Sequence, residues 1–391
     1  MSYQAVRYNL SLSRVLRQKM APSTRRWRAL SSLRYESLGE PVWSHDPHSV
    51  ELEPLLSGIC GSDLGVILGT SSPYLAPLSR FPAVLGHEVV GRVTKDSDDW
   101  AKGTPVVINP ALSCGSLALK DPCLACRDGH AERCYNRGRH ELGMSIGFHT
   151  NFPGGFSQRM WAPSHQLYAI PPEMPLERAV LAEPLSIVLH ALSHVDWSRV
   201  HRVLVIGAGP IGLLTLFALG SQGLPPDLVM AVARYPQQQR WAKRFGAEVV
   251  SELNAPAVTE ITGVRYPSLW HAIPWRSKGF DLIIDAAGSK ASLEGASGCV
   301  NPGGQVLLLG AAGEVHWDFT PMWSRDMTLY GSYGYGNADQ IFPQAIALLD
   351  QAAIPIERLV THTFYLDEYK EAFQTVWDKR QGPLKVCLKA R

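Results

Sequence analysis

The segment RVLVIGAGPIGLLTLFALG, residues 202–220, constrains the fold more than any other part of the 391-residue chain. Residues 203–220 carry no charge and are long enough to span a bilayer. Three glycines and a proline follow the first four of them, however, so a strand, a tight turn and a helix fit better than a membrane span.

The turn within this segment matches a nucleotide-binding pattern. A GxGxxG sequence between a strand and a helix lets backbone N–H groups approach a pyrophosphate at the helix N-terminus. The alternative is an ordinary glycine-rich turn. We expect a dinucleotide to contact Gly207, Gly209, Pro210, Ile211 and Gly212.

Strand and helix patterns alternate after this turn, which predicts a doubly wound parallel sheet. The expected strands are 227–234, 280–288, 304–313 and 327–335, with helices at 236–246 and 289–300. The last strand pattern, 383–390, is expected to return to another domain.

The length of the chain favours two domains, because single hydrophobic cores stop growing near about 250–300 residues. Pro171-Pro172 and a helix starting near Leu176 mark the border. We therefore expect a first domain at 1–176 and 337–391, and a dinucleotide-binding domain at 177–336.

The strand at 227–234 ends in Arg234 rather than in the acid that would hold the ribose 2′-hydroxyl of NAD. A guanidinium can pair with a 2′-phosphate through two hydrogen bonds. The sequence thus favours NADP over NAD, although Arg234 could instead stack on the adenine.

The net charge of +2 gives no reason to expect a nucleic acid or a membrane surface as partner. Seven cysteines without an export signal favour a reducing compartment, and we expect the cytoplasm. One basic region precedes Glu36 and is either a solvated edge of the first strands or a targeting segment. Its cations are Arg7, Arg14, Arg17, Lys19, Arg25, Arg26, Arg28 and Arg34.

Four of the cysteines, Cys114, Cys123, Cys126 and Cys134, lie within 21 positions. A Cys-x-x-Cys turn with two further thiolates can surround zinc tetrahedrally at about 2.3 Å, which gives a closed structural site. The polar loop around them fits a lobe that metal holds together. Unligated buried thiols and a disulfide are the alternatives.

Four further motifs flank this lobe in a fixed order: GICGSDLG (58–65), FPAVLGHEVVGRV (81–93), LAEPLSIVLHAL (181–192) and VLVIGAGPIGLL (203–214). Together with the cysteines, the set resembles the zinc-dependent medium-chain dehydrogenases of alcohols, polyols and sugars. The resemblance runs from about residue 50 to the C-terminus. It implies a mainly β GroES-like catalytic domain beside a Rossmann domain, an α/β fold class. The chain departs from the family's cysteine spacing by six extra residues, LALKDP, after Cys114.

The resemblance assigns Cys60 and His87 as ligands of a catalytic zinc, with Glu88 or Glu183 as the third. A thiolate, an imidazole and a carboxylate would leave one position open for substrate oxygen. Glu183-Pro184 matches the polyol branch of the family. The resemblance also makes Ser62 the hydroxyl that hydrogen-bonds the reacting oxygen. Position 65, which often holds a relay histidine in the family, is glycine.

These observations predict a hydride transfer between NAD(P) and a secondary alcohol of a polyol, sugar or related metabolite. A simple secondary alcohol or an amino alcohol is the alternative substrate. A nucleotide-binding scaffold without catalysis is the alternative class. The resemblance further implies a homo-oligomer, a dimer or a tetramer.

Overall fold

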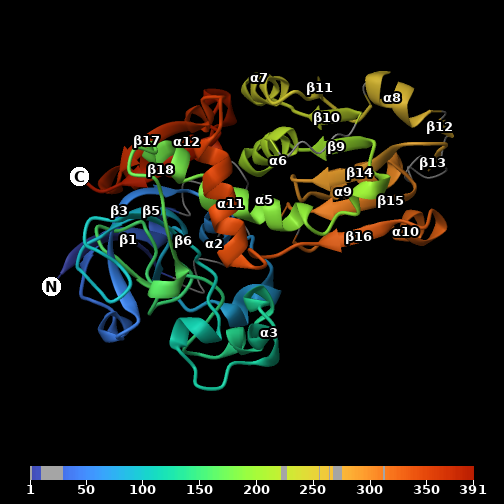
Figure 1. Ribbon diagram of the computed structural model, residues 1–391. Coiled ribbons are helices and arrows are strands. Elements are labelled where there is room, and N and C mark those ends of the chain that lie inside the picture. Colours follow the sequence, from blue (N-terminus) through green and yellow to red (C-terminus); the bar gives the residue numbers. More distant parts are fainter. Residues whose placement is uncertain are drawn as a thin grey trace. The chain divides into compact units, whose positions relative to one another are not determined.

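The computed structural model describes residues 2–9, 30–221, 227–254, 256–263, 265–266, 275–310 and 313–391. The chain divides into two compact units (Figure 1). The first unit comprises Met1–Ser186 and Gly334–Arg391, and the second comprises Ile187–Tyr333. Among the described residues, no helix combines the length and the hydropathy that crossing a bilayer requires.

The first unit is built mainly from β-strands in two sheets. A seven-stranded sheet has the order β17-β18-β3-β5-β6-β8, with β7 also paired to β3, and a smaller sheet has the order β2-β1-β4. Strand β3 is the hub, because it pairs antiparallel with β5, β7 and β18. The strands of this unit are β1 (Tyr3–Tyr8), β2 (Leu33–Leu38), β3 (Ser49–Gly58), β4 (Ala83–Val84), β5 (Glu88–Val93), β6 (Pro105–Ile108), β7 (Met160–Pro163), β8 (Leu167–Ala169), β17 (Val360–Tyr365) and β18 (Lys385–Lys389).

Buried and more exposed side chains alternate along these strands, so the buried faces of the strands form one hydrophobic core. In β3 the pattern of buried and half-buried residues alternates over its first half, so one face points inward. Leu52, Val89 and Phe156 are among the side chains that meet there. The helices of this unit are α2 (Gly61–Leu68), α3 (Leu124–Arg127), α4 (Leu176–Ala179), α11 (Ala338–Asp350) and α12 (Tyr369–Trp377), and α5 (Ala182–Leu192) begins in it.

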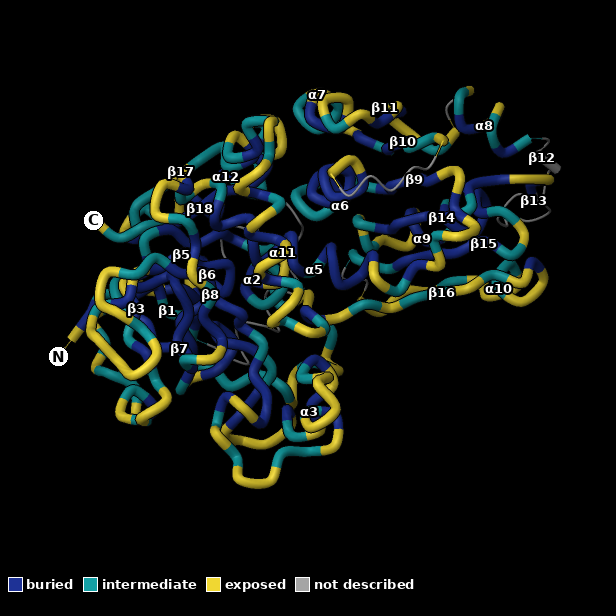
Figure 2. The backbone as a smooth tube through the Cα atoms, viewed as in Figure 1, coloured by how far each residue is buried: buried dark blue, intermediate teal, exposed yellow. Residues whose placement is uncertain are grey.

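The second unit contains the predicted doubly wound sheet. Its six strands are all parallel and have the order β11-β10-β9-β14-β15-β16. The first strand lies in the middle and the chain winds outward in both directions, which is the order of a dinucleotide-binding sheet. The central strands are buried, whereas β16 at the edge is partly exposed (Figure 2). The strands are β9 (Arg202–Ile206), β10 (Leu228–Val232), β11 (Glu248–Val250), β14 (Phe280–Asp285), β15 (Val300–Leu308) and β16 (Thr328–Gly331), with a separate hairpin of β12 (Arg265–Tyr266) and β13 (Trp275–Arg276).

Helix α6 (Pro210–Ser221) follows β9 directly and is buried from Gly212 to Leu219. A helix that is apolar on all sides belongs in the interior of a protein, so the 18 uncharged residues form part of the core of this unit and no membrane span. The other helices are α7 (Pro236–Arg244), α8 (Pro256–Thr262), α9 (Lys290–Cys299) and α10 (Thr320–Ser324).

The borders of the units differ from the predicted domain borders. The second unit starts at Ile187 rather than at residue 177 and ends at Tyr333 rather than at 336. Helix α4 explains the first difference, because it contacts β3, α11 and the turn at Ile356–Leu359, all in the first unit. Glu183 therefore lies in the first unit.

The first cation of the basic region, Arg7, lies on β1, where its guanidinium is 3.5 Å from the Glu36 carboxylate of β2. Arg34 is exposed on β2. The remaining cations of the basic region, Arg14, Arg17, Lys19, Arg25, Arg26 and Arg28, lie outside the described residues.

Candidate active site and metal centres

Two neighbouring strands bring the predicted ligands Cys60 and His87 together. Cys60 follows the end of β3 and precedes α2, and His87 precedes β5. Since β3 and β5 are antiparallel and pair Gly58 with Glu88, the end of one strand meets the start of the other. One donor atom each of Cys60, His87 and Glu88 lies within 4.8 Å of the others.

Asp63 orients the His87 imidazole. One oxygen of the fully buried Asp63 carboxylate accepts a hydrogen bond of 2.9 Å from the Cys60 backbone N–H, and the other lies 3.4 Å from His87 Nδ1. Burial opposes a charged imidazole, but Asp63 and Cys60 raise the pKa of His87. With Nδ1 facing a carboxylate, Nε2 is left to serve as a metal ligand.

Ser62 lies beside this imidazole on the first turn of α2. Its Oγ is 3.3 Å from His87 Nε2, and the residue is exposed. Position 65, one turn further, carries no side chain. A Cβ there would lie 2.9 Å from Ser71 Oγ, so the space next to α2 at this position is already taken.

Glu88 is buried and paired with an ammonium group. Lys385 Nζ lies 2.7 and 2.6 Å from its two oxygens, and both side chains are at most 3% exposed. Gly58 makes room for this carboxylate, because a Cβ there would be 2.1 Å from Glu88 Oε2.

Glu183 lies in the first turn of α5 and is 4% exposed. It is not a member of the group within 4.8 Å, and its carboxylate accepts a hydrogen bond from the Tyr335 hydroxyl. Burial raises the pKa of the Glu183 carboxyl to about 7; Glu88 adds to this effect, while His87 opposes it.

These residues fit a divalent ion. The thiol, imidazole and carboxylate donors are those that zinc prefers, and one donor atom of each lies within 4.8 Å of the others. The structure thus brings together Cys60, His87, Glu88 and Ser62, with Glu183 near them.

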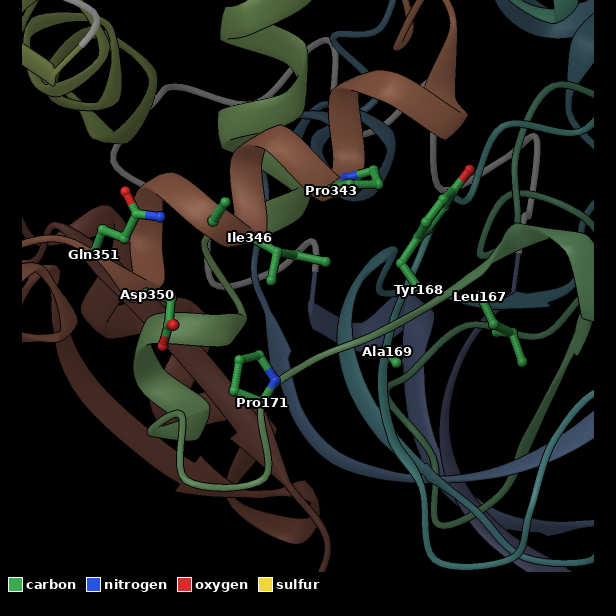
Figure 3. A pocket seen from close by; sticks show the side chains of 9 residues that line it. Leu167, Tyr168, Ala169, Pro171, Pro343, Ile346, Asp350 and Gln351 are labelled. Atoms are coloured by element: carbon green, nitrogen blue, oxygen red, sulfur yellow. The ribbon is translucent and has the colours of Figure 1, made fainter.

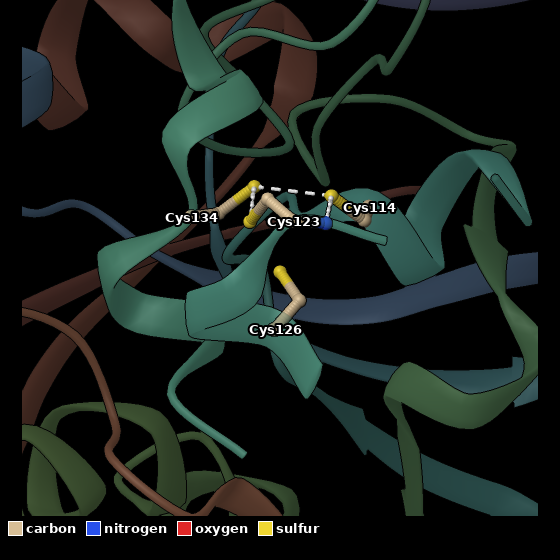
Figure 4. Close-up of side chains that lie close together, drawn as sticks. All are labelled: Cys114, Cys123, Cys126 and Cys134. Carbon is tan, nitrogen blue, oxygen red and sulfur yellow. Dashed lines mark hydrogen bonds between the residues drawn. The ribbon is translucent and has the colours of Figure 1, made fainter. Parts of the chain in front are cut away.

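The cysteine lobe, residues 113–141, gathers its four thiols at one point (Figure 4). Cys114 Sγ and Cys134 Sγ are 3.6 Å apart, and Cys123 Sγ is 3.9 Å from Cys134 Sγ. Four sulfurs at about 2.3 Å from one zinc ion would be separated by about 3.8 Å, whereas a disulfide needs about 2.05 Å. All seven cysteines are unpaired.

Of the six extra residues of this lobe, Ala118, Lys120 and Asp121 are exposed, while the other three are half-buried. A turn at Cys114–Leu117 ends in Ala118 with a φ of 44°, and Leu119 N–H then bonds to the Cys114 carbonyl at 3.1 Å. Leu117 and Leu119 pack against the core of the unit. Because this turn reverses the chain after Cys114, the thiol of Cys114 lies close to the thiols of the other three cysteines.

The second unit has the backbone that a dinucleotide site needs. Gly207 has a φ of 96°, and a Cβ on Gly212 would lie 1.8 Å from the Gly207 carbonyl oxygen, so both positions require glycine. Helix α6 begins at Pro210. The proline lacks a backbone N–H, but the first residue of a helix has no intrahelical acceptor for that group, so no hydrogen bond is lost. Arg234 is exposed, two residues after β10, and makes no ion pair within the described part of the chain.

Two residues of the candidate site were missed by sequence reasoning. Nothing in the sequence marked Tyr335 as a site residue, because it lies at the end of the expected strand 327–335. Lys385 gave a weak one, because it is a charged residue at the start of a strand whose next three residues are buried.

A groove of about 440 Å³ lies elsewhere in the first unit, along β8 and α11 (Figure 3). Tyr168, Pro171 and Ile346 are among the residues that line it. None of the predicted site residues does, so the groove is separate from the candidate active site.

Comparisons with known proteins identify the family of the chain. Residues 46–172 match a family model described as the alcohol dehydrogenase GroES-like domain, and residues 176–388 match one described as the glucose dehydrogenase C-terminus. The chain is 28% identical over 360 residues to (R,R)-butanediol dehydrogenase of Saccharomyces cerevisiae, covering 85% of this chain and 88% of that protein. It is 28% identical to L-arabinitol 4-dehydrogenase of Aureobasidium melanogenum, covering 88% of each. The solved structure of alcohol dehydrogenase TADH from Thermus sp. ATN1 superimposes with a TM-score of 0.74 at 25% identity, over 99% of this chain and 100% of that one.

Proposed function

The chain belongs to the zinc-dependent medium-chain dehydrogenases, and on that premise we propose that it oxidises a secondary alcohol of a polyol or sugar-like metabolite with NADP. It is an NAD(P)-dependent oxidoreductase with a GroES-like domain and a Rossmann domain. One observation carries the proposal: donor atoms of Cys60, His87 and Glu88 lie within 4.8 Å, with the exposed Ser62 hydroxyl 3.3 Å from His87 Nε2.

In the proposed site, Cys60 and His87 hold the catalytic ion together with Glu88 or Glu183. When bound, zinc supplies Lewis-acid chemistry that lowers the pKa of an alcohol beside it. Cys114, Cys123, Cys126 and Cys134 hold a second zinc ion, which has a structural role.

The chain's own residues then position the substrate and move its proton. Asp63 keeps Nε2 of His87 free, and the Ser62 hydroxyl accepts a hydrogen bond from the alcohol and passes the proton on to water. The hydride goes from the alcohol carbon to the nicotinamide ring, so the products are a ketone, the reduced cofactor and one proton. Gly65 offers no imidazole for the next proton transfer, which leaves that step to solvent near Ser71.

The cofactor site uses the turn at Gly207, Gly209, Pro210, Ile211 and Gly212 to bind the pyrophosphate. Arg234 pairs with the 2′-phosphate, which is why we propose NADP. We further propose a cytoplasmic homo-oligomer.

A simple diol or secondary alcohol is the second candidate substrate, because one of the relatives is a butanediol dehydrogenase. Absorbance at 340 nm distinguishes the two. The zinc-loaded protein is mixed with NADP or NAD and with a panel of polyols, vicinal diols and simple secondary alcohols. We expect the largest kcat/KM with a polyol, and a response to simple alcohols alone contradicts the substrate assignment.

The Ser62→Ala variant tests the catalytic residues in the same assay. We expect kcat to fall about 100-fold, the usual size of a lost acid–base contact, with nucleotide binding unchanged. Ser79→Ala, on a serine outside the site, is the matched control.

A further inference from the structure

The buried ammonium group of Lys385 lies beside the candidate metal site, and no sequence motif predicted it there. Lys385 Nζ contacts both oxygens of Glu88, at 2.7 and 2.6 Å. Glu88 is also one of the three residues whose donor atoms lie within 4.8 Å of one another. The same carboxylate is therefore within reach of two cations, the lysine ammonium and an ion held by Cys60 and His87.

The order of the strands creates this arrangement. Strand β3 lies between β5, which carries Glu88, and β18, which carries Lys385. Gly58 on β3 is paired with Glu88 on one side and with Cys387 on the other. A side chain at Gly58 would collide with the Glu88 carboxylate, so this glycine lets the lysine reach across β3.

Charge balance gives the pair a role at the site. As ligands, the Cys60 thiolate and the Glu88 carboxylate would match the two positive charges of a divalent ion, and the buried carboxylates of Asp63 and Glu183 lie beside them. An uncompensated charge in a buried site is costly. The Lys385 ammonium, 3% exposed, adds a positive charge beside these carboxylates without acting as a ligand.

We propose that Lys385 is a positioning residue that competes with the metal ion for Glu88, and so sets how tightly the ion is held and keeps one of its positions open. The inference rests on the proposed function, since it requires the catalytic ion. Without the ammonium, Glu88 is free to ligate the ion with its full charge.

The test compares the full-length Lys385→Met variant with the wild-type protein. Zinc release is followed with an excess of a chromogenic chelator, and the phase that disappears in Cys60→Ser is assigned to the catalytic site. We expect Lys385→Met to slow this phase at least tenfold. Lys385→Arg, which keeps the charge, is the control and should remain within about threefold of the wild type.

Cobalt substitution separates ligation by Glu88 from a simple charge effect. In Co²⁺-loaded Lys385→Met, the visible d–d bands should shift and weaken as a further oxygen ligand is added. The double variant Glu88→Gln/Lys385→Met should keep the wild-type spectrum, because the carboxylate is gone. An unchanged spectrum in Lys385→Met, or a release of zinc that is equal to or faster than in the wild type, overturns the inference.

Two further outcomes are distinguishable. If the wild type has no zinc phase that depends on Cys60, the proposed function fails and this inference fails with it. If Lys385→Met does not fold, Lys385→Gln replaces it, because the amide keeps a donor for Glu88. Lys385→Gln should slow the release of zinc at least threefold. A release rate equal to that of the wild type would count against the inference.

Discussion

Single side chains from distant parts of the chain complete the candidate site. The Tyr335 hydroxyl donates to the Glu183 carboxylate, and both residues are buried. A buried carboxylate that loses a donor keeps the cost of its desolvation. Tyr335 therefore stabilises the Glu183 carboxylate of the site.

Replacing Tyr335 by Phe removes this donor and keeps the aromatic ring, which lies 5.2 Å from the ring of Phe342. We expect the free energy of unfolding to fall by about 1–2 kcal/mol. Urea denaturation measures the difference. Tyr74→Phe is the matched control, because Tyr74 is 85% exposed and should be neutral. Equal stability of the Tyr335 variant and the wild type would show that the hydrogen bond is not formed.

In the proposed function, Arg234 sets the preference for NADP over NAD. Arg234→Ala removes the guanidinium that pairs with the 2′-phosphate, so we expect kcat/KM for NADP to fall at least about tenfold and that for NAD to change less than about twofold. Initial rates at 340 nm with both cofactors give the ratio. Arg240→Ala, on an exposed arginine of α7, is the control. A parallel loss with NAD and NADP would favour adenine stacking instead.

At the scale of elements, the cysteine lobe depends on its thiols because it contains only short helical turns. Cys126→Ser should reduce the zinc content from two ions per chain to about one and destabilise the lobe. Elemental analysis after gel filtration measures the content. Cys299→Ser is the matched control, since Cys299 is a buried thiol of α9 outside the lobe and its loss should leave both ions in place. Two zinc ions in Cys126→Ser would contradict the structural site.

An ion-pair network joins strand β3 to the residue before β7 and to the segment after β5. The Glu51 carboxylate lies 2.9 Å from both Arg159 and Lys95. Burial raises the pKa of Glu51, but the hydrogen bonds from Arg159 and Lys95 outweigh it and lower the pKa from 4.5 to about 2. Because the folded-state pKa is the lower one, the stabilisation is present above about pH 4.5 and is lost as the pH falls toward 2.

Glu51→Gln should thus destabilise the protein by about 1 kcal/mol at pH 7, after allowing for screening by solvent, and by about 0.4 kcal/mol at pH 3. Urea denaturation at both pH values checks the difference. Glu53→Gln is the control on the same strand, because its side chain is 49% exposed and lies 3.8 Å from Arg92. A Glu51→Gln effect that does not change with pH would contradict the assigned cause.

Across the whole molecule, the sequence predicted the features that local patterns determine. The parallel sheet followed from buried apolar runs that alternate with helices, and the turn at Gly207 followed from its glycines. The four cysteines were grouped correctly by their spacing, despite the six extra residues.

Contacts between distant segments could not be predicted in this way. Lys385 and Glu88 are 297 positions apart, and Tyr335 and Glu183 are 152 apart. Neither pair leaves a periodic pattern, because each depends on strand order or on the return of the chain to the first unit. The border at Ser186 was missed for a similar reason, since α4 packs on elements near the C-terminus.

The central claim is that Cys60 and His87 hold a catalytic zinc ion. Anomalous diffraction at the zinc absorption edge, from crystals of the full-length protein, tests it most directly. We expect two peaks per chain, one about 2.3 Å from Cys60 Sγ and about 2.1 Å from His87 Nε2, and one among the four thiols of the cysteine lobe. A zinc-loaded crystal with a peak at the lobe and none between Cys60 and His87 would contradict it.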